Sequence, residues 1–446
     1  MQATTGRIAA AVRRGGPTWV AGAIAAGPAT MAALVTAGAT AGYGLMWVVV
    51  ASALLGATTQ WLSTRLAIVS EAGIVETVDA RLGPRWGWLV VGVTVVAAGL
   101  AQLIIMKTLA DISVTVVGGP TWAWALVWAS VLALGLGGGG YRAAEAAAKL
   151  LLAMVVGAFL VSVLVVPVDL GAVLAGSRPR APSDLAAVVS IAGILGGAVH
   201  ITLITMQTYT VRARGWTTED RQLARWDTAA AMLGGFGLYS VAIYLVAATV
   251  LPAAGLTDVT AISASMALGP LVGAAAESLF LLGLLGAAVT TLGGNTIVAP
   301  LLVADKLGWD PSIRDGRYRA MVMGVALLSA AGAVIEGAVL PLLVIVLAFG
   351  LLGTPFIMAV VLVLGTDMEL MGTHRMGVGA IAAGAVAIVI TAVSAGGFVW
   401  SRLVQGGTGA LDAMVLLLAL AMALSTVAVV ARGLGWMGPR VVLQQG

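Results

Sequence analysis

Ionisable side chains within the long apolar stretches of this sequence are the first candidates for chemistry. His200 is the only histidine inside such a stretch, and Glu277 is a lone carboxylate in another. Lys107 and Asp111 are four residues apart, a spacing that puts both on one face of a helix. An ionisable group inside a membrane is costly and by default indicates a functional site. The alternatives are structural: a neutral, hydrogen-bonded His200 and a self-contained Lys107–Asp111 pair.

Several kinds of chemistry are excluded by residue type. The chain has no cysteine, so disulfides, zinc thiolates and iron–sulfur clusters are unavailable. The sequence contains no histidine-rich metal cluster, no Gly-x-Ser-x-Gly motif and no pair of aspartates within an apolar stretch. We therefore predict that the protein is not an enzyme, and that it holds neither a cofactor nor a resident metal.

The composition is that of a membrane protein. Of 446 residues, 60% are hydrophobic and only 9% are charged, with a mean hydropathy of +1.06, whereas soluble domains carry about 25% charged residues. Stretches of ~20 apolar residues, enough to cross a bilayer as a helix, recur along the whole chain. This composition excludes a soluble enzyme, a nucleic-acid-binding protein and a disordered chain. The lipid bilayer is the expected partner, and no nucleic acid is.

The elements that must position these side chains are about twelve membrane-spanning helices. The apolar runs do not alternate with polar residues, which excludes a transmembrane β-barrel. The expected spans are 18–44, 45–68, 87–117, 121–138, 147–167, 186–210, 227–251, 270–293, 318–337, 339–365, 376–399 and 409–431.

The basic residues predict the orientation of these spans. If the N-terminus is cytoplasmic, 19 of the 23 lysines and arginines fall on the inner side of the membrane. This bias follows the positive-inside rule and predicts that both termini are cytoplasmic. It also explains the sequence pI of about 9.7 without nucleic acid. We expect no cleaved signal peptide and predict a location in the bacterial inner membrane.

Several segments, taken in order, resemble the NRAMP (natural resistance-associated macrophage protein) family of divalent-metal transporters. The resemblance covers about residues 17–400, and its motifs are specific only in combination. These motifs are Ala37-Gly38-Ala39, Gly42-Tyr43, Leu45-Met46-Trp47, the run 63–69, Gly140-Tyr141-Arg142 with Glu145, the runs 192–198 and 279–285, Pro355-Phe356 and the run 367–372.

The resemblance implies an all-α polytopic protein of the LeuT-type fold, which characterises the amino acid–polyamine–organocation (APC) superfamily. In that fold two inverted repeats of five spans each begin with a helix broken at mid-membrane, where substrate binds. The implied segments are a cytoplasmic N-terminus (1–17), the first repeat (18–168), the second repeat (186–366), spans 11 and 12 (376–431) and a cytoplasmic C-terminus (432–446).

The residues expected at the substrate site depart from the NRAMP pattern. The family's Asp-Pro-Gly-Asn in span 1 corresponds here to Gly27-Pro28-Ala29-Thr30, and its Met-Pro-His in span 6 corresponds to His200-Ile201-Thr202. We predict that these seven residues and Gly197 bind substrate. A carboxylate neutralises a bound cation, and a thioether favours late transition metals. Since both are missing, the sequence predicts that the transition-metal site is lost.

The expected proton-coupling residues are altered as well. Gln102 stands where the family has an aspartate in span 3, and Gln207 stands where it has a second histidine in span 6. The remaining candidates for coupling to H⁺ or Na⁺ are His200, Gln102, Gln207, Lys107, Asp111 and Glu277.

Three functions remain open from the sequence. The favoured one is a secondary transporter for a small anionic or zwitterionic organic solute, because half-helix N-termini attract anions and Gly27, Ala29, Gly196 and Gly197 are small enough to leave room. The second is a transporter of Mn²⁺- or Mg²⁺-type ions in hydrated form, using Thr30 and backbone carbonyls. The third is a non-transporting sensor or assembly subunit. The sequence predicts no particular oligomeric state.

Overall fold

The fold is described by a computed structural model that covers residues 16–138, 141–256, 259–406 and 409–434. All regular structure in these ranges is helical, which confirms the predicted all-α class. The predicted terminal segments fall almost entirely on residues 1–15 and 435–446, outside the described residues.

The first part of the chain contains two helices in place of one for the first expected span. Its elements are α2 (Pro17–Ala25), α3 (Pro28–Ala41), the 3₁₀ turn η1 (Gly42–Leu45), α4 (Met46–Ser70), α5 (Ile74–Arg81), α6 (Pro84–Val117), α7 (Thr121–Gly138), α8 (Tyr141–Val165) and α9 (Leu170–Gly176).

The second part is likewise divided at its first span. Its elements are α10 (Leu185–Val199), α11 (Ile201–Ala213), η2 (Thr218–Asp220), α12 (Arg221–Ala229), the π-helical η3 (Ala230–Gly237), α13 (Leu238–Ala253), α14 (Ala261–Ser265), η4 (Met266–Leu268), α15 (Gly269–Val272), η5 (Gly273–Ala275), α16 (Ala276–Thr296), α17 (Val298–Leu307), α18 (Gly316–Leu328), η6 (Ser329–Val334), α19 (Val339–Leu351), α20 (Thr354–Thr366), α21 (Met368–Met371), η7 (Gly372–His374), α22 (Val378–Val404) and α23 (Ala410–Gly433).

The number of uninterrupted apolar helices is smaller than the expected number of spans. Among the described residues, nine helical stretches are long and apolar enough to cross a membrane, or ten if α8 and α9, bent by 117°, count as one. Two reasons account for the difference from twelve. The stretch Pro28–Ser70 contains most of the first two expected spans, because η1 joins them without a gap. The ninth expected span consists of the short α18 and the 3₁₀ segment η6.

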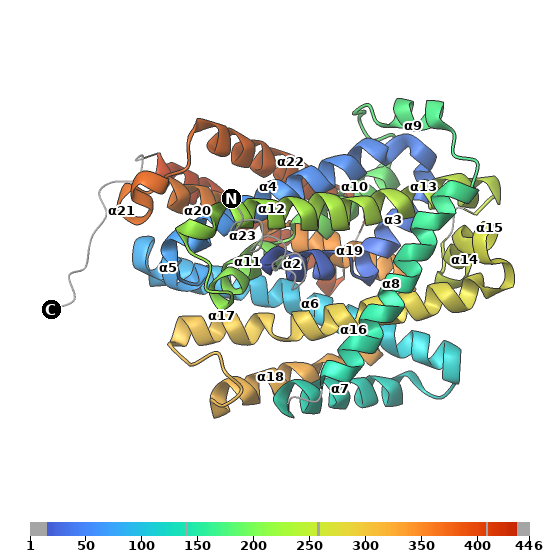
Figure 1. The fold of residues 1–446 in the computed structure, drawn as a ribbon, viewed down its shortest axis with the longest axis horizontal. Coiled ribbons are helices and arrows are strands. Elements are labelled where there is room, and N and C mark those ends of the chain that lie inside the picture. The colour runs from blue at the N-terminus through green and yellow to red at the C-terminus, as the bar shows by residue number, and fades with distance from the viewer. Residues whose placement is uncertain (1–15, 139–140, 257–258, 407–408, 435–446) are drawn as a thin grey trace, which may run out of the picture.

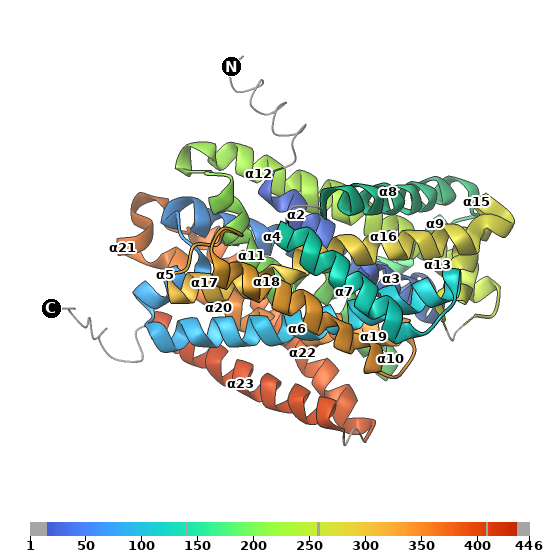
Figure 2. The ribbon, with the colours of Figure 1, turned by 90° about the horizontal axis from the view of Figure 1, so that it is seen from below.

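The long helices run roughly along the longest axis of the molecule (Figure 1). Figures 1 and 2 both place α5, α17 and α21 at one end, and α9 and α15 at the opposite end, where Figure 1 also shows α14. The helices α3, α10 and α19 pack against one another inside the bundle. The site residues therefore have protein on several sides.

Burial separates the central helices from the peripheral ones. In Val339–Thr366, which contains α19 and α20, 94% of the most apolar window is buried, against 22% in α22 and 17% in α23. A helix that is apolar on all sides but little buried by protein presents its remaining surface to lipid. The last two helices therefore lie at the periphery of the bundle, as the lower edge of Figure 2 also shows.

The ends of several helices are defined by local side-chain chemistry. Asp184 and Asp169 accept hydrogen bonds from backbone N–H groups in the first turns of α10 and α9, which satisfies donors that a helix leaves free. These contacts with N–H groups and with Ser183 lower the pKa of Asp184. At the other terminus, α17 ends at Gly308, whose left-handed conformation (φ 67°) favours glycine.

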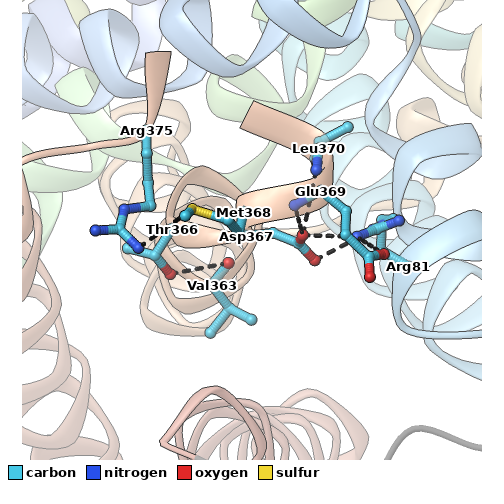
Figure 3. Close-up of polar contacts among 8 residues, drawn as sticks. All are labelled: Arg81, Val363, Thr366, Asp367, Met368, Glu369, Leu370 and Arg375. Atoms are coloured by element: carbon cyan, nitrogen blue, oxygen red, sulfur yellow. Dashed lines mark hydrogen bonds and ion pairs between the residues drawn. The ribbon is translucent and has the colours of Figure 1, made fainter. Parts of the chain in front are cut away.

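A charged cluster joins α5 to α21 at one end of the molecule (Figure 3). The Arg81 guanidinium donates to both carboxylate oxygens of Asp367, at 2.6 and 3.1 Å, and to Glu369 at 2.7 Å. Asp367 also accepts from the backbone N–H groups of Glu369 and Leu370 at the start of α21. These hydrogen bonds, foremost the one with Asp367, raise the pKa of Arg81. The cluster connects two segments that are 286 residues apart.

Candidate functional site

The first expected span is interrupted between α2 and α3. Helix α2 ends at Ala25, and α3 begins at Pro28 after an extended Gly27 (φ −73°, ψ −179°). The proline ring has no N–H to continue the helical hydrogen-bond ladder. The Thr30 hydroxyl donates to the Ala25 carbonyl across the interruption. Thr30 therefore ties the two half-helices together.

The sixth expected span is interrupted at a single residue without proline. His200 is extended (φ −71°, ψ 153°) and separates α10 from α11. The Thr354 hydroxyl donates to the Val199 carbonyl at 2.6 Å, which satisfies one of the carbonyls that a helix end leaves free. The His200 side chain packs against α19, because a Cβ at Gly350 would lie 3.1 Å from the His200 Cβ. The helix is therefore interrupted at His200 although the proline is absent.

The remaining residues expected at the second break lie in the first turn of α11. Ile201 is buried and packs against Gly353, in the bend between α19 and α20. Thr202 is also buried, and its carbonyl accepts a hydrogen bond from the Thr205 hydroxyl. At the first break, Ala29 is buried on α3. The structure thus brings the expected residues to two helix interruptions inside the bundle.

The glycines near the breaks allow close helix packing and do not leave free space. A Cβ at Gly197 would lie 2.6 Å from the Thr30 hydroxyl oxygen, and one at Gly196 would lie 2.2 Å from the Leu347 carbonyl oxygen. At these distances a side chain larger than glycine collides with α3 or α19. The expectation that these small residues make room for an organic solute is therefore wrong, because other helices occupy that room.

Gln60 is a polar residue of this region that the sequence reasoning missed. It is fully buried on α4, and neither its amide nitrogen nor its amide oxygen has a hydrogen-bond partner. Gly56, one turn earlier, packs against Ala198, and Ser63 donates to the Ile204 carbonyl at 2.8 Å. Gln60 therefore lies level with the His200 break. The signal in the sequence is an uncharged amide within an apolar span, but the only amides considered were Gln102 and Gln207, at the family's coupling positions.

Thr291 on α16 provides a second unpartnered oxygen. Its hydroxyl is buried and has no hydrogen-bond partner, and it lies 2.6 Å from the position of a Cβ at Gly27. Buried polar groups in proteins almost always have partners. An oxygen acceptor without a partner therefore lies beside each break. Each of these oxygens can accept a hydrogen bond from a ligand or water, or coordinate a cation.

All donor atoms at the breaks are neutral. They are the Thr30 and Thr291 hydroxyls, the Gln60 amide, the His200 imidazole and the backbone carbonyls at the ends of α2 and α10. No group of three or more histidine, cysteine, aspartate or glutamate side chains that could hold a metal occurs in the described ranges. Such a set can bind a small divalent ion that keeps part of its water shell, because ions of the Mg²⁺ type lose their water reluctantly.

Comparison with known proteins identifies the scaffold. The family model described as "Natural resistance-associated macrophage protein-like" matches residues 18–401, which is most of the chain. The chain belongs to the NRAMP family. Among curated relatives, the divalent metal cation transporter MntH of Deinococcus radiodurans is 28% identical over 305 residues, covering 66% of this chain and 69% of that protein. MntH of Acidiphilium cryptum is 27% identical and covers 84% and 87% of the two chains.

Solved structures confirm the LeuT-type fold. The Eremococcus coleocola manganese transporter, solved in complex with an aromatic bis-isothiourea substituted compound, matches with a TM-score of 0.72 at 16% identity, over 94% of this chain and 93% of that one. Mhp1, a nucleobase–cation symporter with bound bromovinylhydantoin, matches with a TM-score of 0.54 at 15% identity, over 87% and 93%. At these identities the likeness establishes the fold alone. The protein is an integral membrane protein of a transporter family.

The favoured prediction of a non-metal organic solute is contradicted by these comparisons. The curated relatives in this family are named divalent metal cation transporters, so the second prediction, a divalent cation, fits better. The physical error lay in considering only the N-termini of α3 and α11, which attract anions. Each break equally presents the C-terminal end of α2 or α10, whose partial negative charge attracts cations.

Gln102, a coupling candidate of this NRAMP chain, belongs to a neutral network between α6 and α16. Its amide nitrogen donates to Thr296 at 2.7 Å, and its amide oxygen accepts from Asn295 at 2.9 Å. Asn295 also donates to the Ala98 carbonyl at 2.7 Å. A cavity of about 200 Å³ borders Gln102 and Asn295. The network is hydrogen-bonded but contains no group that titrates near neutral pH.

Gln207 belongs to a second hydrogen-bonded network, on the side of the breaks toward the α5 end, which also reaches a carboxylate. Its amide nitrogen donates to Thr18 at 3.0 Å and to Thr64 at 2.8 Å, while its amide oxygen has no partner. The Thr18 backbone N–H donates to the Asp227 carboxylate at 2.9 Å. This network joins α2 and α11, which are halves of the two broken helices, to α4 and α12.

The three other coupling candidates, Lys107, Asp111 and Glu277, lie on α6 and α16. Lys107 and Asp111 form an ion pair at 2.8 Å along α6, in which the side chains are 10% and 29% exposed. Next to this pair, a Cβ at Gly332 in η6 would lie 3.2 Å from the Lys107 backbone nitrogen. Glu277 is exposed in the first turn of α16, where the helix dipole favours a carboxylate. The structure thus places Glu277 at a helix terminus, away from the interior of the span.

Proposed function

We propose that this protein transports a divalent metal cation across the membrane by alternating access. The observation that carries the proposal is the pair of helix breaks packed against each other, where the C-terminal ends of α2 and α10 lie beside the unpartnered side-chain oxygens of Gln60 and Thr291. Support also comes from the relatives that are named divalent metal cation transporters. We infer that the ion binds partly hydrated, because the surrounding donors are neutral and hard cations such as Mn²⁺ and Mg²⁺ accept oxygen ligands and water.

In this proposal the donors have distinct roles. The Gln60 amide oxygen and the Thr291 hydroxyl, both buried and unpartnered, contact the ion or its water shell. His200 supplies a neutral nitrogen at the second break, and Thr30 keeps lone pairs free while it donates to Ala25. The Thr354 hydroxyl already donates to the Val199 carbonyl. At the second break, the α10 carbonyls that precede Val199 are therefore the backbone oxygens that contact the ion.

The test is ion uptake into vesicles that contain the full chain. We expect saturable Mn²⁺ uptake, and we expect His200→Ala and Gln60→Leu each to raise the KM by about tenfold, the equivalent of one lost polar contact. His374→Ala and Gln405→Leu are matched controls outside the breaks and should leave the KM unchanged. Uptake of Mn²⁺ and Mg²⁺ no greater than in protein-free vesicles would contradict metal transport. An unchanged KM in both site variants would contradict the site while leaving transport intact.

We propose that the α5, α17 and α21 end faces the cytoplasm, with both termini on that side of the bacterial inner membrane. The excess of arginine and lysine in the segments at this end supports the orientation. Because the chain has no cysteine, one can be introduced on each side without a background signal. In intact cells, an impermeant maleimide should label Ser177→Cys beyond α9 but not Asp310→Cys after α17. The reverse pattern would invert the topology.

Coupling to H⁺ or Na⁺ also remains a proposal for this chain. Since Gln102 and Gln207 are neutral and hydrogen-bonded, they can order water but cannot carry charge themselves. Metal uptake measured with an imposed pH gradient, an imposed Na⁺ gradient and neither will separate the possibilities. A rate that responds to one gradient identifies the coupling ion, whereas a rate that responds to neither contradicts coupling.

A further inference from the structure

A group of arginines without ion-pair partners lies beside α12, in the segment that connects α11 to α13. Arg214, Arg221 and Arg225 are exposed, and the described part of the chain shows no ion pair or hydrogen bond of their side chains. Arg212 is different, because it pairs with Glu76 at 3.1 Å. The three guanidiniums therefore carry positive charge that no direct ion pair among the described residues neutralises.

Helix α12 has two distinct faces. Ala224, Asp227 and Thr228 are buried toward the bundle, whereas Arg221 and Arg225, one turn apart, lie on the exposed face. The indole of Trp226, on the same side, is 58% exposed. Figure 2 shows α12 along one margin of the molecule, above α2. Arginines and an exposed tryptophan at one end of a membrane-spanning stretch are typical of the headgroup level of a bilayer.

The charges around α12 indicate an anionic partner. Few acidic groups lie next to the arginines. Asp220 caps the turn that precedes α12, and Asp227 faces α2 and attracts Arg214 without pairing with it. Of these acidic groups, only Glu219 is exposed. Arginine guanidiniums bind phosphate in a bidentate geometry, and tryptophan favours the headgroup level of a membrane. Since α12 continues through η3 into α13 and forms one end of the membrane-spanning stretch Thr218–Ala253, the phosphates within its reach are those of the adjacent leaflet.

We propose that Arg214, Arg221, Arg225 and Trp226 form a binding surface for the headgroups of anionic phospholipids. Lipid binding at this surface does not depend on the proposed metal transport, and only its effect on Mn²⁺ uptake through α2 rests on that function. Each guanidinium near an anionic bilayer surface strengthens binding by about fivefold. The attraction weakens as salt is added, because ions screen exposed charges.

The surface is mechanically connected to the first helix break. On the buried face of α12, the Asp227 carboxylate accepts from the Thr18 backbone N–H at 2.9 Å, and the Thr228 hydroxyl lies 3.2 Å from that of Thr18. Thr18 belongs to the first turn of α2, the half-helix that ends at the break. Bound lipid therefore holds α12 in place and, through this contact, stabilises the position of α2.

The test uses the full chain in vesicles of phosphatidylcholine with or without phosphatidylglycerol. Trp226 fluorescence, obtained as the difference between the wild type and Trp226→Phe, should be quenched more strongly by brominated phosphatidylglycerol than by brominated phosphatidylcholine. The triple variant Arg214→Gln, Arg221→Gln, Arg225→Gln should lose this preference. The double variant Arg178→Gln, Arg180→Gln, with exposed arginines beyond α9, is the matched control and should keep it.

The quenching experiment tests lipid binding, and the uptake experiment tests the connection to α2. Equal quenching by the two lipids in the wild type, or an unchanged preference in the triple variant, would overturn the lipid-binding surface. Because quenching requires no metal, it separates this inference from a failure of the proposed transport. If the initial rate of Mn²⁺ uptake rises with phosphatidylglycerol in the wild type but not in the triple variant, the connection to α2 is supported. A rate that does not depend on the lipid in either protein would overturn that connection.

Discussion

The helix breaks inside the bundle and the contact between α5 and α21 at its end hold the chain by different chemistry. At the breaks, distant segments meet through glycines, hydroxyls and carbonyls, as at Gly197 and Thr30. At the end, Arg81 meets Asp367 and Glu369 as full charges. The difference follows from solvent access, because an unneutralised charge costs far more inside a membrane than near water. In this NRAMP chain, charge anchors the periphery while the centre is left neutral.

Gly197→Val tests whether the helix breaks depend on the close approach of α10 to α3. It is expected to have the largest effect. Its Cβ would lie 2.6 Å from the Thr30 hydroxyl oxygen, and overpacking of this kind costs about 1–3 kcal/mol or more. We expect a lower thermal midpoint in detergent and the loss of Mn²⁺ uptake. Gly379→Ala, where a Cβ meets nothing within 4 Å, is the control. Wild-type stability and uptake in Gly197→Val would show that free space exists at the breaks.

Asp367→Asn tests the charged end and should have the second-largest effect. The Asp367 side chain is 3% exposed, whereas that of Glu369 is 76% exposed, although both contact Arg81. Removing the buried partner leaves a guanidinium poorly compensated, at a cost of about 2–3 kcal/mol after allowance for the partial exposure of Arg81. Glu369→Gln should cost less than about 1 kcal/mol. Thermal unfolding of both variants measures the difference, and equal shifts would contradict this account of the cluster.

Thr354→Val compares the two breaks with each other. The substitution keeps the shape of the side chain but leaves the Val199 carbonyl without its donor, which costs about 1 kcal/mol. Thr30→Val removes the corresponding contact with Ala25 at the first break, and it also removes a proposed neighbour of the ion. We expect similar decreases in thermal stability but a rise in the KM for Mn²⁺ only in Thr30→Val. A larger KM change in Thr354→Val would reverse the assignment.

Asp315 provides the smallest expected effect and the clearest dependence on pH. Hydrogen bonds from the Arg317 side chain and backbone lower its pKa from 3.8 to about 2. A carboxylate with a depressed pKa in the folded state contributes stability that is present above pH 3.8 and is lost as the pH falls toward 2. Asp315→Asn, which keeps an oxygen at the start of α18, should abolish this part of the pH dependence. Thermal unfolding between about pH 2 and pH 5 measures it, and identical profiles would contradict it.

Much of the fold could be predicted from the sequence, because apolar length and charge asymmetry are local properties of the chain. The all-α class and the LeuT-type fold were predicted correctly, and the breaks occur at the segments containing Pro28 and His200. The expected count of twelve spans did not match uninterrupted helices, since η1 and η6 alter helix continuity without changing hydropathy. The positions of the breaks follow from proline chemistry and family resemblance, whereas helix continuity depends on packing.

The substrate prediction failed for a reason that lies in three dimensions. From the sequence, Gly196 and Gly197 could mean either free space or close packing, and only Leu347 and Thr30, which approach from other helices, decide for packing. Gln60 could not be recognised either, because an amide becomes informative only when it is known to be buried without a partner. The type of a residue limits which contacts it can make, and the tertiary structure decides which of these contacts are made.

By itself, the sequence determined that this protein is a helical membrane protein, where its helices are interrupted, and that the two break segments lack acidic side chains. These properties depend on solvation and backbone chemistry, which act residue by residue. Only the tertiary structure decided that glycines of α10 close around Thr30, that Gln60 and Thr291 are left with free oxygens, and that Arg81 meets Asp367 across 286 residues. Such contacts depend on how distant helices pack, and packing is a property of the whole chain.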